Sequence, residues 1–184
     1  MLQLGQAFFE TPRVWSSSTS WLEGKILSVE GHELLQAAVD DNRGLLLIVP
    51  HQGNWEVVGL WLSAQTQMTS LYEPPKIAQL ESWIKSSREQ SGAKLVPTDV
   101  RGVAALIKAL KRGETTAILP DQQPGPQGGV MVPFMGVPAR TMTLVTNLID
   151  RSGCTALLAT ALREPGGWRL HFLPASDALY SDDQ

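Results

Sequence analysis

The chain is short of cysteine and histidine. Its single cysteine, Cys154, excludes an internal disulfide and stands where a helical pattern gives way to an apolar strand, so we expect a buried, reduced, structural thiol. The three histidines, at positions 32, 51 and 171, are too scattered for a zinc site of the H-E-x-x-H type, so we expect neither metal nor cofactor.

Long apolar runs and a strong charge of either sign are also missing. No stretch approaches the ~18 consecutive apolar residues of a membrane-spanning helix, and the first residues, MLQLGQAFFETPRV, lack the order of a signal peptide. The net charge of −3 supplies no basic field, so we expect no nucleic-acid partner. With 43% hydrophobic residues, the 184-residue chain is long enough for one globular domain, either cytosolic or peripherally attached to a membrane.

Short apolar runs alternate with amphipathic helical patterns from about Lys25 onward. This rhythm predicts an α/β fold, with a central, largely parallel or mixed sheet flanked by helices. Residues 45–50, LLLIVP, form an apolar run without alternation, as expected of a strand covered on both faces. We expect further strands at 26–31, 68–72, 93–97, 115–119, 155–164 and 168–175, one apolar strand within 129–136, and helices at 32–41, 77–90, 98–112 and 141–152.

Two groups of polar residues are open to a plain structural interpretation. The helix expected after Thr98 carries a basic face, for which solvation is the first explanation and contact with a phosphorylated substrate or an anionic membrane the second. His32 opens a predicted helix and His171 alternates with apolar residues in a predicted strand, so we assign both histidines structural or surface roles. The basic face comprises Arg101, Lys108, Lys111 and Arg112.

The stretch PHQGNWE, directly after the apolar run 45–50, carries the chemistry. His51 would lie in the connection before a helix that starts near Asn54. Gly53 permits a turn that other residues resist, and we expect this turn to bring the Glu56 carboxylate to one nitrogen of the His51 ring. The other nitrogen would then face a cleft as a general base for a hydroxyl or water. A His-x4-Glu pair is a weak signal by itself.

Five blocks strengthen that signal: VPHQGNWE, LYEPPK, GVAALIKALKRGE, ILPDQQPGPQGGVMVPFMG and ARTMTLV. In this order and register they resemble the late acyltransferases of lipid A biosynthesis, the lauroyl/myristoyl transferases, which belong to the lysophospholipid and glycerol-phosphate acyltransferase superfamily. The resemblance extends from about Ser28 to Pro174. It implies a glycerol-phosphate acyltransferase-like fold and a single acyltransferase domain, residues 1–184, without the family's N-terminal membrane anchor and C-terminal section.

The resemblance also implies a reaction. An acyl-carrier protein, or acyl-CoA, would donate an acyl group as a thioester to a hydroxyl of a lipid A precursor, at the cytoplasmic face of the bacterial inner membrane. His51 would be the base and Glu56 its orienting residue, with no acyl-enzyme, which agrees with the absence of a placed Ser or Cys nucleophile. Substrate-binding roles are implied for Asn54, Tyr72, Lys76, Asp121, Gln122 and Arg140.

The sequence departs from the family pattern at Tyr72-Glu73-Pro74, where many relatives have Tyr-Arg-Pro. Lys76 is the candidate substitute, although lysine lacks the bidentate fork of arginine. Asp121 has an alternative interpretation as a turn residue before Pro124. Contact with a membrane surface would depend on four exposed aromatic residues: Phe8, Phe9, Trp15 and Trp21.

Three other functions remain open. The first is a glycerophospholipid or lysophospholipid acyltransferase, although that branch commonly has Asp at the fifth position after His and Pro-Glu-Gly where this chain has Pro120-Asp121-Gln122. The second is a hydrolase in which His51 activates water. The third is an inactive, lipid-binding paralogue.

Overall fold

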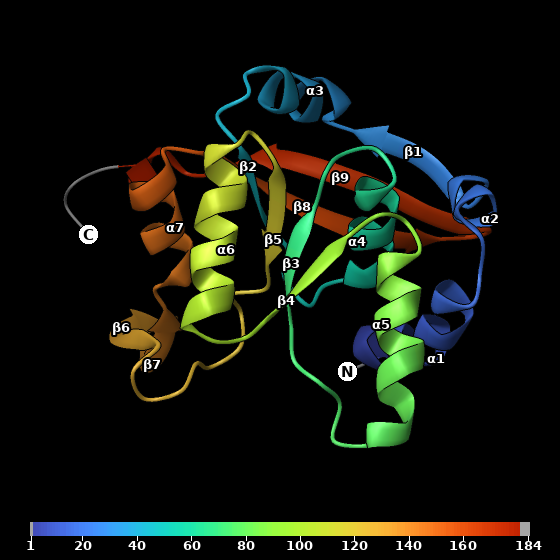
Figure 1. Cartoon of the computed structure of the whole chain (residues 1–184), viewed down its shortest axis with the longest axis horizontal. Helices are drawn as coiled ribbons and strands as arrows, with labels where there is room; N and C mark the ends of the chain where they lie inside the picture. The colour runs from blue at the N-terminus through green and yellow to red at the C-terminus, as the bar shows by residue number, and fades with distance from the viewer. Residues whose placement is uncertain (1, 181–184) are drawn as a thin grey trace.

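A central sheet of five strands organises the fold. The computed structural model describes residues 2–180, and its strand order is β1-β9-β8-β2-β5 (Figure 1). All neighbours are parallel except β8 and β9, which form an antiparallel hairpin. The predicted mixed α/β fold is thereby confirmed, while its likeness to glycerol-phosphate acyltransferases stays a prediction. The strands are β1 Ile26–Glu30, β2 Leu45–Ile48, β5 Thr115–Ile118, β8 Thr155–Glu164 and β9 Gly167–Pro174.

The strand β2 lies inside this sheet, between β8 and β5, as its unbroken apolar sequence predicts. Leu45, Leu46 and Leu47 are all buried to within 1% of full burial. Cys154, just before β8, is completely buried, and burial raises the pKa of its thiol. The expected structural cysteine is confirmed, and it supplies no accessible nucleophile.

Helices pack against both sides of this sheet. The helix α4 directly follows β2 and is almost entirely buried, whereas α6 and α7 lie side by side at one end of the molecule (Figure 1). At the other end α1 contacts α4 and α5. The helices are α1 Leu2–Trp15, α2 Thr19–Glu23, α3 His32–Asp40, α4 Trp55–Ser63, α5 Glu81–Glu89, α6 Val100–Lys111 and α7 Leu144–Ser152, with short 3-10 turns η1 Ala78–Leu80 and η2 Asp177–Tyr180.

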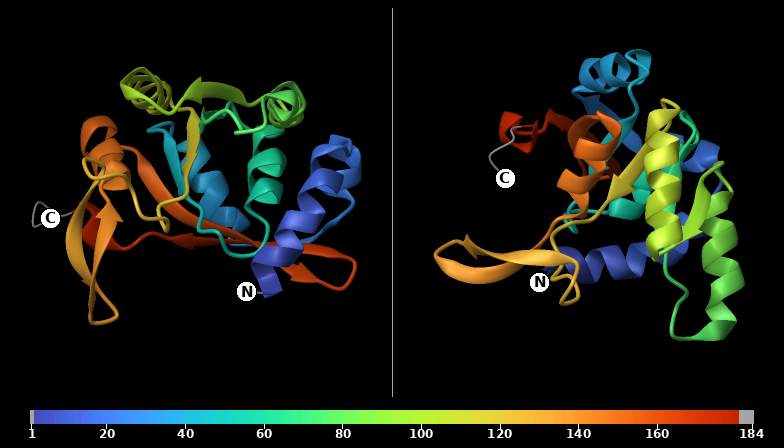
Figure 2. Two further views of the ribbon diagram at one scale, coloured as in Figure 1. Left: turned by 90° about the horizontal axis from the view of Figure 1, so that it is seen from below. Right: turned by 60° about the vertical axis from the view of Figure 1, so that its left-hand side comes forward.

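Two smaller sheets have two strands each. The strands β3 Thr69–Tyr72 and β4 Lys94–Pro97 form a parallel pair beside β5, linked to it by a bridge from Met68 to Thr115. The strands β6 Gly129–Phe134 and β7 Val137–Met142 form an antiparallel hairpin that projects from the body (Figure 2). The prediction of one strand within 129–136 was therefore incomplete, because β7 occupies residues 137–140, for which no element was predicted, and the first two residues of the helix predicted from 141.

The N-terminal aromatic residues divide into two groups. Phe8 and Phe9 are 76% and 83% exposed, as expected. Trp15 and Trp21, in contrast, pack against the main hydrophobic core, and their predicted exposure was wrong. Within residues 2–180, the structure contains no helix with both the length and the apolar character needed to cross a bilayer.

Candidate active site

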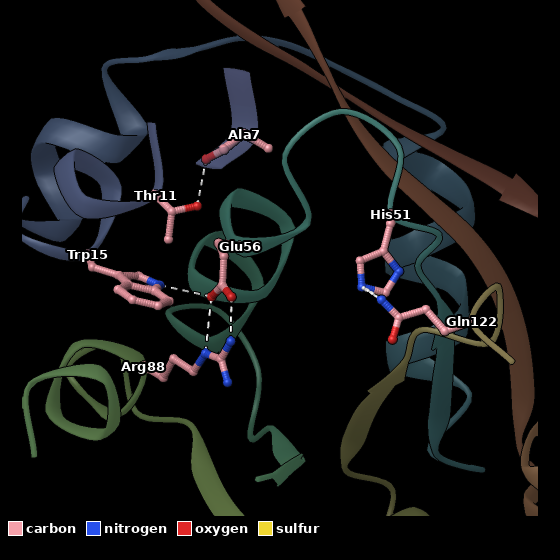
Figure 3. Close-up of polar contacts among 7 residues, drawn as sticks. All are labelled: Ala7, Thr11, Trp15, His51, Glu56, Arg88 and Gln122. Carbon is pink, nitrogen blue, oxygen red and sulfur yellow. Dashed lines mark hydrogen bonds and ion pairs between the residues drawn. The ribbon is translucent and has the colours of Figure 1, made fainter. Parts of the chain in front are cut away.

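The His51 side chain lies just beyond the carboxyl end of β2 and is held by the loop that follows β5. Its Nδ1 lies 2.8 Å from Asp121 Oδ1, and its backbone N–H donates to Asp121 Oδ2 at 2.7 Å. The side-chain amide nitrogen of Gln122 lies 3.1 Å from Nε2 on the other side of the ring (Figure 3). Because β2 and β5 are parallel neighbours, their carboxyl ends bring these residues together across 70 positions of sequence.

These contacts select one tautomer of the imidazole. An amide NH2 group can only donate, so the Gln122 contact requires a lone pair on Nε2. The proton of the neutral ring then resides on Nδ1 and is donated to Asp121. This arrangement leaves Nε2 as a basic nitrogen, and 20% exposure of the His51 side chain keeps it accessible.

The Asp121 carboxyl is ionised in this arrangement. Partial burial by itself would raise its pKa, but hydrogen bonds from the His51 side chain and backbone outweigh that effect and hold the pKa below its ordinary value. A carboxylate that accepts from Nδ1–H fixes the ring orientation and stabilises the imidazolium that forms when Nε2 takes a proton.

The predicted contact between His51 and Glu56 is wrong. The Glu56 carboxylate instead points toward α1 and α5 (Figure 3), where it accepts from Trp15 Nε1 at 3.0 Å and from Arg88 Nη2 and Nε at 2.5 and 3.2 Å. Glu56 is only 7% exposed. Its position in the first turn of α4 directs it away from His51, so the residue that orients the imidazole is Asp121.

The loop from His51 to Asn54 rests on two further elements. Gly53 has φ +69°, as its expected turn conformation requires, and a Cβ there would lie 2.0 Å from the carbonyl oxygen of Ala161 on β8. The Asn54 side chain donates to Glu10 of α1 at 2.9 Å, and Glu10 also accepts from Arg163 Nε at 2.6 Å. Asn54 is 1% exposed, so the structure gives it a supporting position in the loop, and its predicted contact with substrate stays a prediction.

Three of the predicted substrate-binding residues line one cavity. Asp121, Gln122 and Arg140 border a space of about 540 Å³ between the loop after β5 and the β6–β7 hairpin. Arg140 adds a cationic side chain to this lining, and the rest of the hairpin wall is largely apolar. The remaining lining includes Met131, Phe134, Pro138 and Ala139.

The other two predicted binding residues lie elsewhere. Tyr72, at the end of β3, is 7% exposed and lies under the Arg88 guanidinium, 5.9 Å from the ring centre. Burial is the main cause that raises the pKa of its hydroxyl. Lys76 is exposed on the segment between β3 and η1. Neither residue lines the cavity of Asp121 and Arg140.

A second, smaller and mainly apolar cavity of about 140 Å³ lies between α4 and the β3–β4 pair. Trp55 connects it with the histidine, since its ring lines this cavity and lies 4.6 Å from the His51 ring. Glu56 and Arg88 close one side of it. The apolar lining includes Val49, Gly59, Leu60, Met68, Leu71, Leu95, Ala117 and Leu119.

The other two histidines met the expectations of the sequence. His32 is exposed at the first position of α3, and the partly buried His171 lies 3.6 Å from Glu30 on the neighbouring strand. Among residues 2–180 no group of three or more His, Cys, Asp or Glu side chains is arranged to hold a metal ion.

Comparison with known proteins now decides the family. The family model described as bacterial lipid A biosynthesis acyltransferase matches residues 1–184. The chain belongs to this family. It is 30% identical over 185 residues to the lipid A biosynthesis palmitoleoyltransferase of Escherichia coli (strain K12), in a match that covers 98% of this chain and 59% of the relative.

Two further relatives of the chain are also acyltransferases. The lipid A biosynthesis lauroyltransferase of Escherichia coli (strain K12) is 28% identical, and the match again covers 98% of this chain and 59% of the relative. The phosphatidylinositol mannoside acyltransferase of Mycobacterium tuberculosis (strain ATCC 25618 / H37Rv) is 27% identical, over 84% of this chain and 50% of the relative. The chain thus spans about half to three fifths of the length of these relatives.

The residues that sequence reasoning missed are those that hold Glu56 and Asn54 in place. Arg88 and Trp15 neutralise and bind Glu56, whereas Glu10 and Arg163 support Asn54.

One signal was available for the pairing of His51 with Asp121. Each directly follows a proline that ends a continuous apolar strand, in LLLIVPH and in AILPD, so each occupies the same position at the carboxyl end of its strand.

Proposed function

We propose that this chain is an O-acyltransferase that moves a fatty acyl group from a thioester to a hydroxyl of a lipid A precursor. The observation that carries the proposal is the His51 ring, which is bound at Nδ1 by Asp121 and contacts Gln122 through Nε2. Asp121 and Gln122 both line the cavity that also includes Arg140. Membership of an acyltransferase family supports the class of reaction. The whole chain, residues 1–184, would act as one acyltransferase domain.

In the proposed reaction, the acceptor hydroxyl displaces Gln122 from Nε2 of His51. Nε2 takes the hydroxyl proton while the hydroxyl oxygen attacks the thioester carbonyl carbon. The tetrahedral intermediate then collapses, the C–S bond breaks, and the leaving thiolate receives the proton from Nε2. The products are an ester and a free thiol, and no acyl-enzyme forms.

The two carboxylates would have different tasks in this mechanism. Asp121 accepts the hydrogen bond from Nδ1–H and compensates the positive charge that develops on His51. Glu56 takes part as a positioning residue, because its ion pair with Arg88 fixes the first turn of α4 against α5. The catalytic role that the sequence assigned to Glu56 is thereby reassigned to Asp121 within the proposal.

The two cavities suggest where the substrates lie. We assign the polar head of the acceptor to the cavity of Asp121 and Arg140, where a guanidinium suits a phosphate group. Lys76, on an exposed segment, is a second cation for such a head group. The apolar cavity beside Trp55 suits the acyl chain of the donor. An acyl-carrier protein or coenzyme A would carry that chain, and the site of action would be the cytoplasmic face of the inner membrane.

The test is transfer of a labelled lauroyl group from acyl-carrier protein to a detergent-dispersed tetra-acylated lipid A precursor. The wild-type chain is compared with His51→Ala and with His32→Ala, a matched control at an exposed helix start. We expect His32→Ala to equal wild type and His51→Ala to lose ~100- to 10,000-fold in rate. Full activity of His51→Ala would refute the proposed base, and release of free fatty acid as the main product would identify a hydrolase instead.

A further inference from the structure

The β6–β7 hairpin presents an apolar surface that the rest of the chain leaves uncovered. Consecutive residues of a strand point to opposite faces, yet Val130, Met131 and Val132 are 54%, 60% and 36% exposed. Both faces of this two-stranded ribbon are therefore apolar and open to solvent. At its end Phe134, Met135 and Val137 are 63%, 91% and 65% exposed.

The tip residue is chosen against local backbone preference. Phe134 pairs with Val137, so Met135 and Gly136 form a two-residue turn with φ values of +50° and +82°. Turns with two positive φ values favour Asn-Gly or Asp-Gly, and an unbranched apolar residue gains nothing at the first position. A methionine with nearly all of its surface exposed in this strained position indicates an apolar environment outside the chain.

The charge and the shape of the hairpin indicate what covers its apolar surface. No charged residue stands between Asp121 and Arg140, so the whole projecting part of the hairpin is neutral. A partner protein that covers one face of the ribbon would leave the other apolar face in water. A lipid layer surrounds both faces at once and requires no shape match.

We propose that the β6–β7 hairpin inserts its tip into a lipid surface and thereby sets the cavity of Asp121 and Arg140 at the bilayer boundary. The proposal rests on the proposed function for the identity of the lipid acceptor. Its geometry is independent of that function, since Met131 and Phe134 belong to the hairpin and also line this cavity. An acceptor could then pass from the lipid layer to His51 along an apolar wall.

Two labelled variants test the insertion directly. Cys154 is fully buried, so Met135→Cys introduces an exposed thiol for an environment-sensitive fluorophore. Leu27→Cys, at a residue that is 48% exposed on β1, is the matched control. Each labelled chain is mixed with vesicles of equal parts phosphatidylethanolamine and phosphatidylglycerol. We expect a blue shift, and quenching by lipid-borne quenchers, at position 135 and neither change at position 27.

A second pair of variants measures the contribution to affinity. Met135→Asn with Val137→Thr supplies the preferred Asn-Gly turn and keeps a β-branched residue, so the hairpin fold is preserved while the tip becomes polar. Vesicle affinity in a flotation assay should fall ~10-fold or more, because the variant lacks the apolar side chains of Met135 and Val137 that leave water when the tip inserts. Leu27→Thr should bind as wild type does. The wild-type binding should also persist at high salt, because it is not an interaction of charges.

The outcomes separate this inference from the proposed function. Unchanged vesicle affinity of the double variant, a water-exposed label at position 135 on bound vesicles, or a label that responds only to acyl-carrier protein would each overturn the insertion. If the label enters lipid but the wild-type chain transfers no acyl group to a detergent-dispersed acceptor, the insertion stands and the acyltransferase proposal falls. The insertion and the acyltransferase reaction are both supported if the double variant transfers acyl groups normally to detergent-dispersed acceptor and poorly to acceptor embedded in vesicles.

Discussion

Replacement of Glu56 by glutamine is the most informative perturbation of this protein. The sequence assigns Glu56 to the orientation of His51, whereas the structure binds it to Arg88 and Trp15. The two assignments predict opposite results. A carboxylate that orients a base affects turnover, and a carboxylate that neutralises a partly buried guanidinium affects the free energy of unfolding.

The magnitude follows from the burial of the pair. Breaking a buried ion pair by removal of one partner costs ~3–5 kcal/mol, because the other charge is left uncompensated. Arg88 keeps 30% of its side chain exposed, and water at its guanidinium reduces this cost. The glutamine also retains one acceptor oxygen, while its NH2 group would face an N–H donor of Arg88. We therefore expect Glu56→Gln to lower the free energy of unfolding by ~2–3 kcal/mol.

Urea denaturation at neutral pH measures this loss, and a double-mutant cycle assigns it. Arg88→Met should cost more than Glu56→Gln, because it leaves a carboxylate unpaired that is only 7% exposed. The double variant should be more stable than the sum of the two single losses predicts, with a coupling energy of ~1–2 kcal/mol. The acyl-transfer rate of Glu56→Gln, measured well below its unfolding temperature, should fall by much less than the ~100-fold expected when a general base is disabled.

A purely structural role for Glu56 is refuted if Glu56→Gln unfolds at the wild-type urea concentration but loses transfer to the extent of His51→Ala. That result would return the orienting role to Glu56 and would mean that its contacts rearrange when substrate binds. An absence of coupling between Glu56 and Arg88 would equally refute the ion pair as the source of any lost stability.

Three further predictions test the site. Asp121→Asn should reduce transfer ~100-fold or more. The pKa of Asp121 is lowered in the folded state, so its stabilising contribution is present above pH ~4 and is lost as pH falls through that lowered value. The difference in unfolding free energy between Asp121→Asn and wild type should therefore shrink in acid. An unchanged difference would contradict the pair with His51. Gln122→Ala should cost less than ~10-fold in rate, since the acceptor hydroxyl must displace Gln122 in any case, and a loss equal to that of His51→Ala would give Gln122 a catalytic task. Gly59 lines the apolar cavity, and a Cβ at this position meets nothing within 4 Å. Gly59→Leu should therefore fill part of the cavity and shift donor preference toward shorter acyl chains, with Gly59→Ala as control. An unaltered chain-length profile would exclude that cavity as the acyl site.

Features set by local sequence were predictable. The apolar run 45–48 became an inner strand because a segment covered on both faces needs no polar alternation. Gly53 took a positive φ because the turn after a strand approaches β8 so closely that any Cβ would clash with Ala161. The helix α6 begins after its Asp99 cap, whose carboxylate accepts from the N–H groups of Arg101 and Gly102.

Features set by distant partners were not predictable from spacing. The choice between Asp121 and Glu56 as partner of His51 depends on which strand lies beside β2, and a spacing of five residues is silent about that. Likewise, the second strand of the hairpin was hidden because Met-Gly is not a usual turn pair. Trp15 was expected at the surface. It is partly buried because it packs against Trp83 of α5, at 5.3 Å between ring centres, and the local sequence does not show this distant contact.

The position of His51 depends on contacts from three directions. Asp121 holds it from β5, the backbone of Ala161 on β8 meets Gly53, and α1 reaches the same loop through Glu10 and Asn54. A catalytic group must be kept within ~0.5 Å of its working position, and a loop without its own hydrogen-bond ladder cannot provide that precision alone. Because α1 also donates to Glu56 through Trp15, one helix supports both Asn54 and Glu56. Residues that do not contact His51 therefore contribute to the position of its side chain.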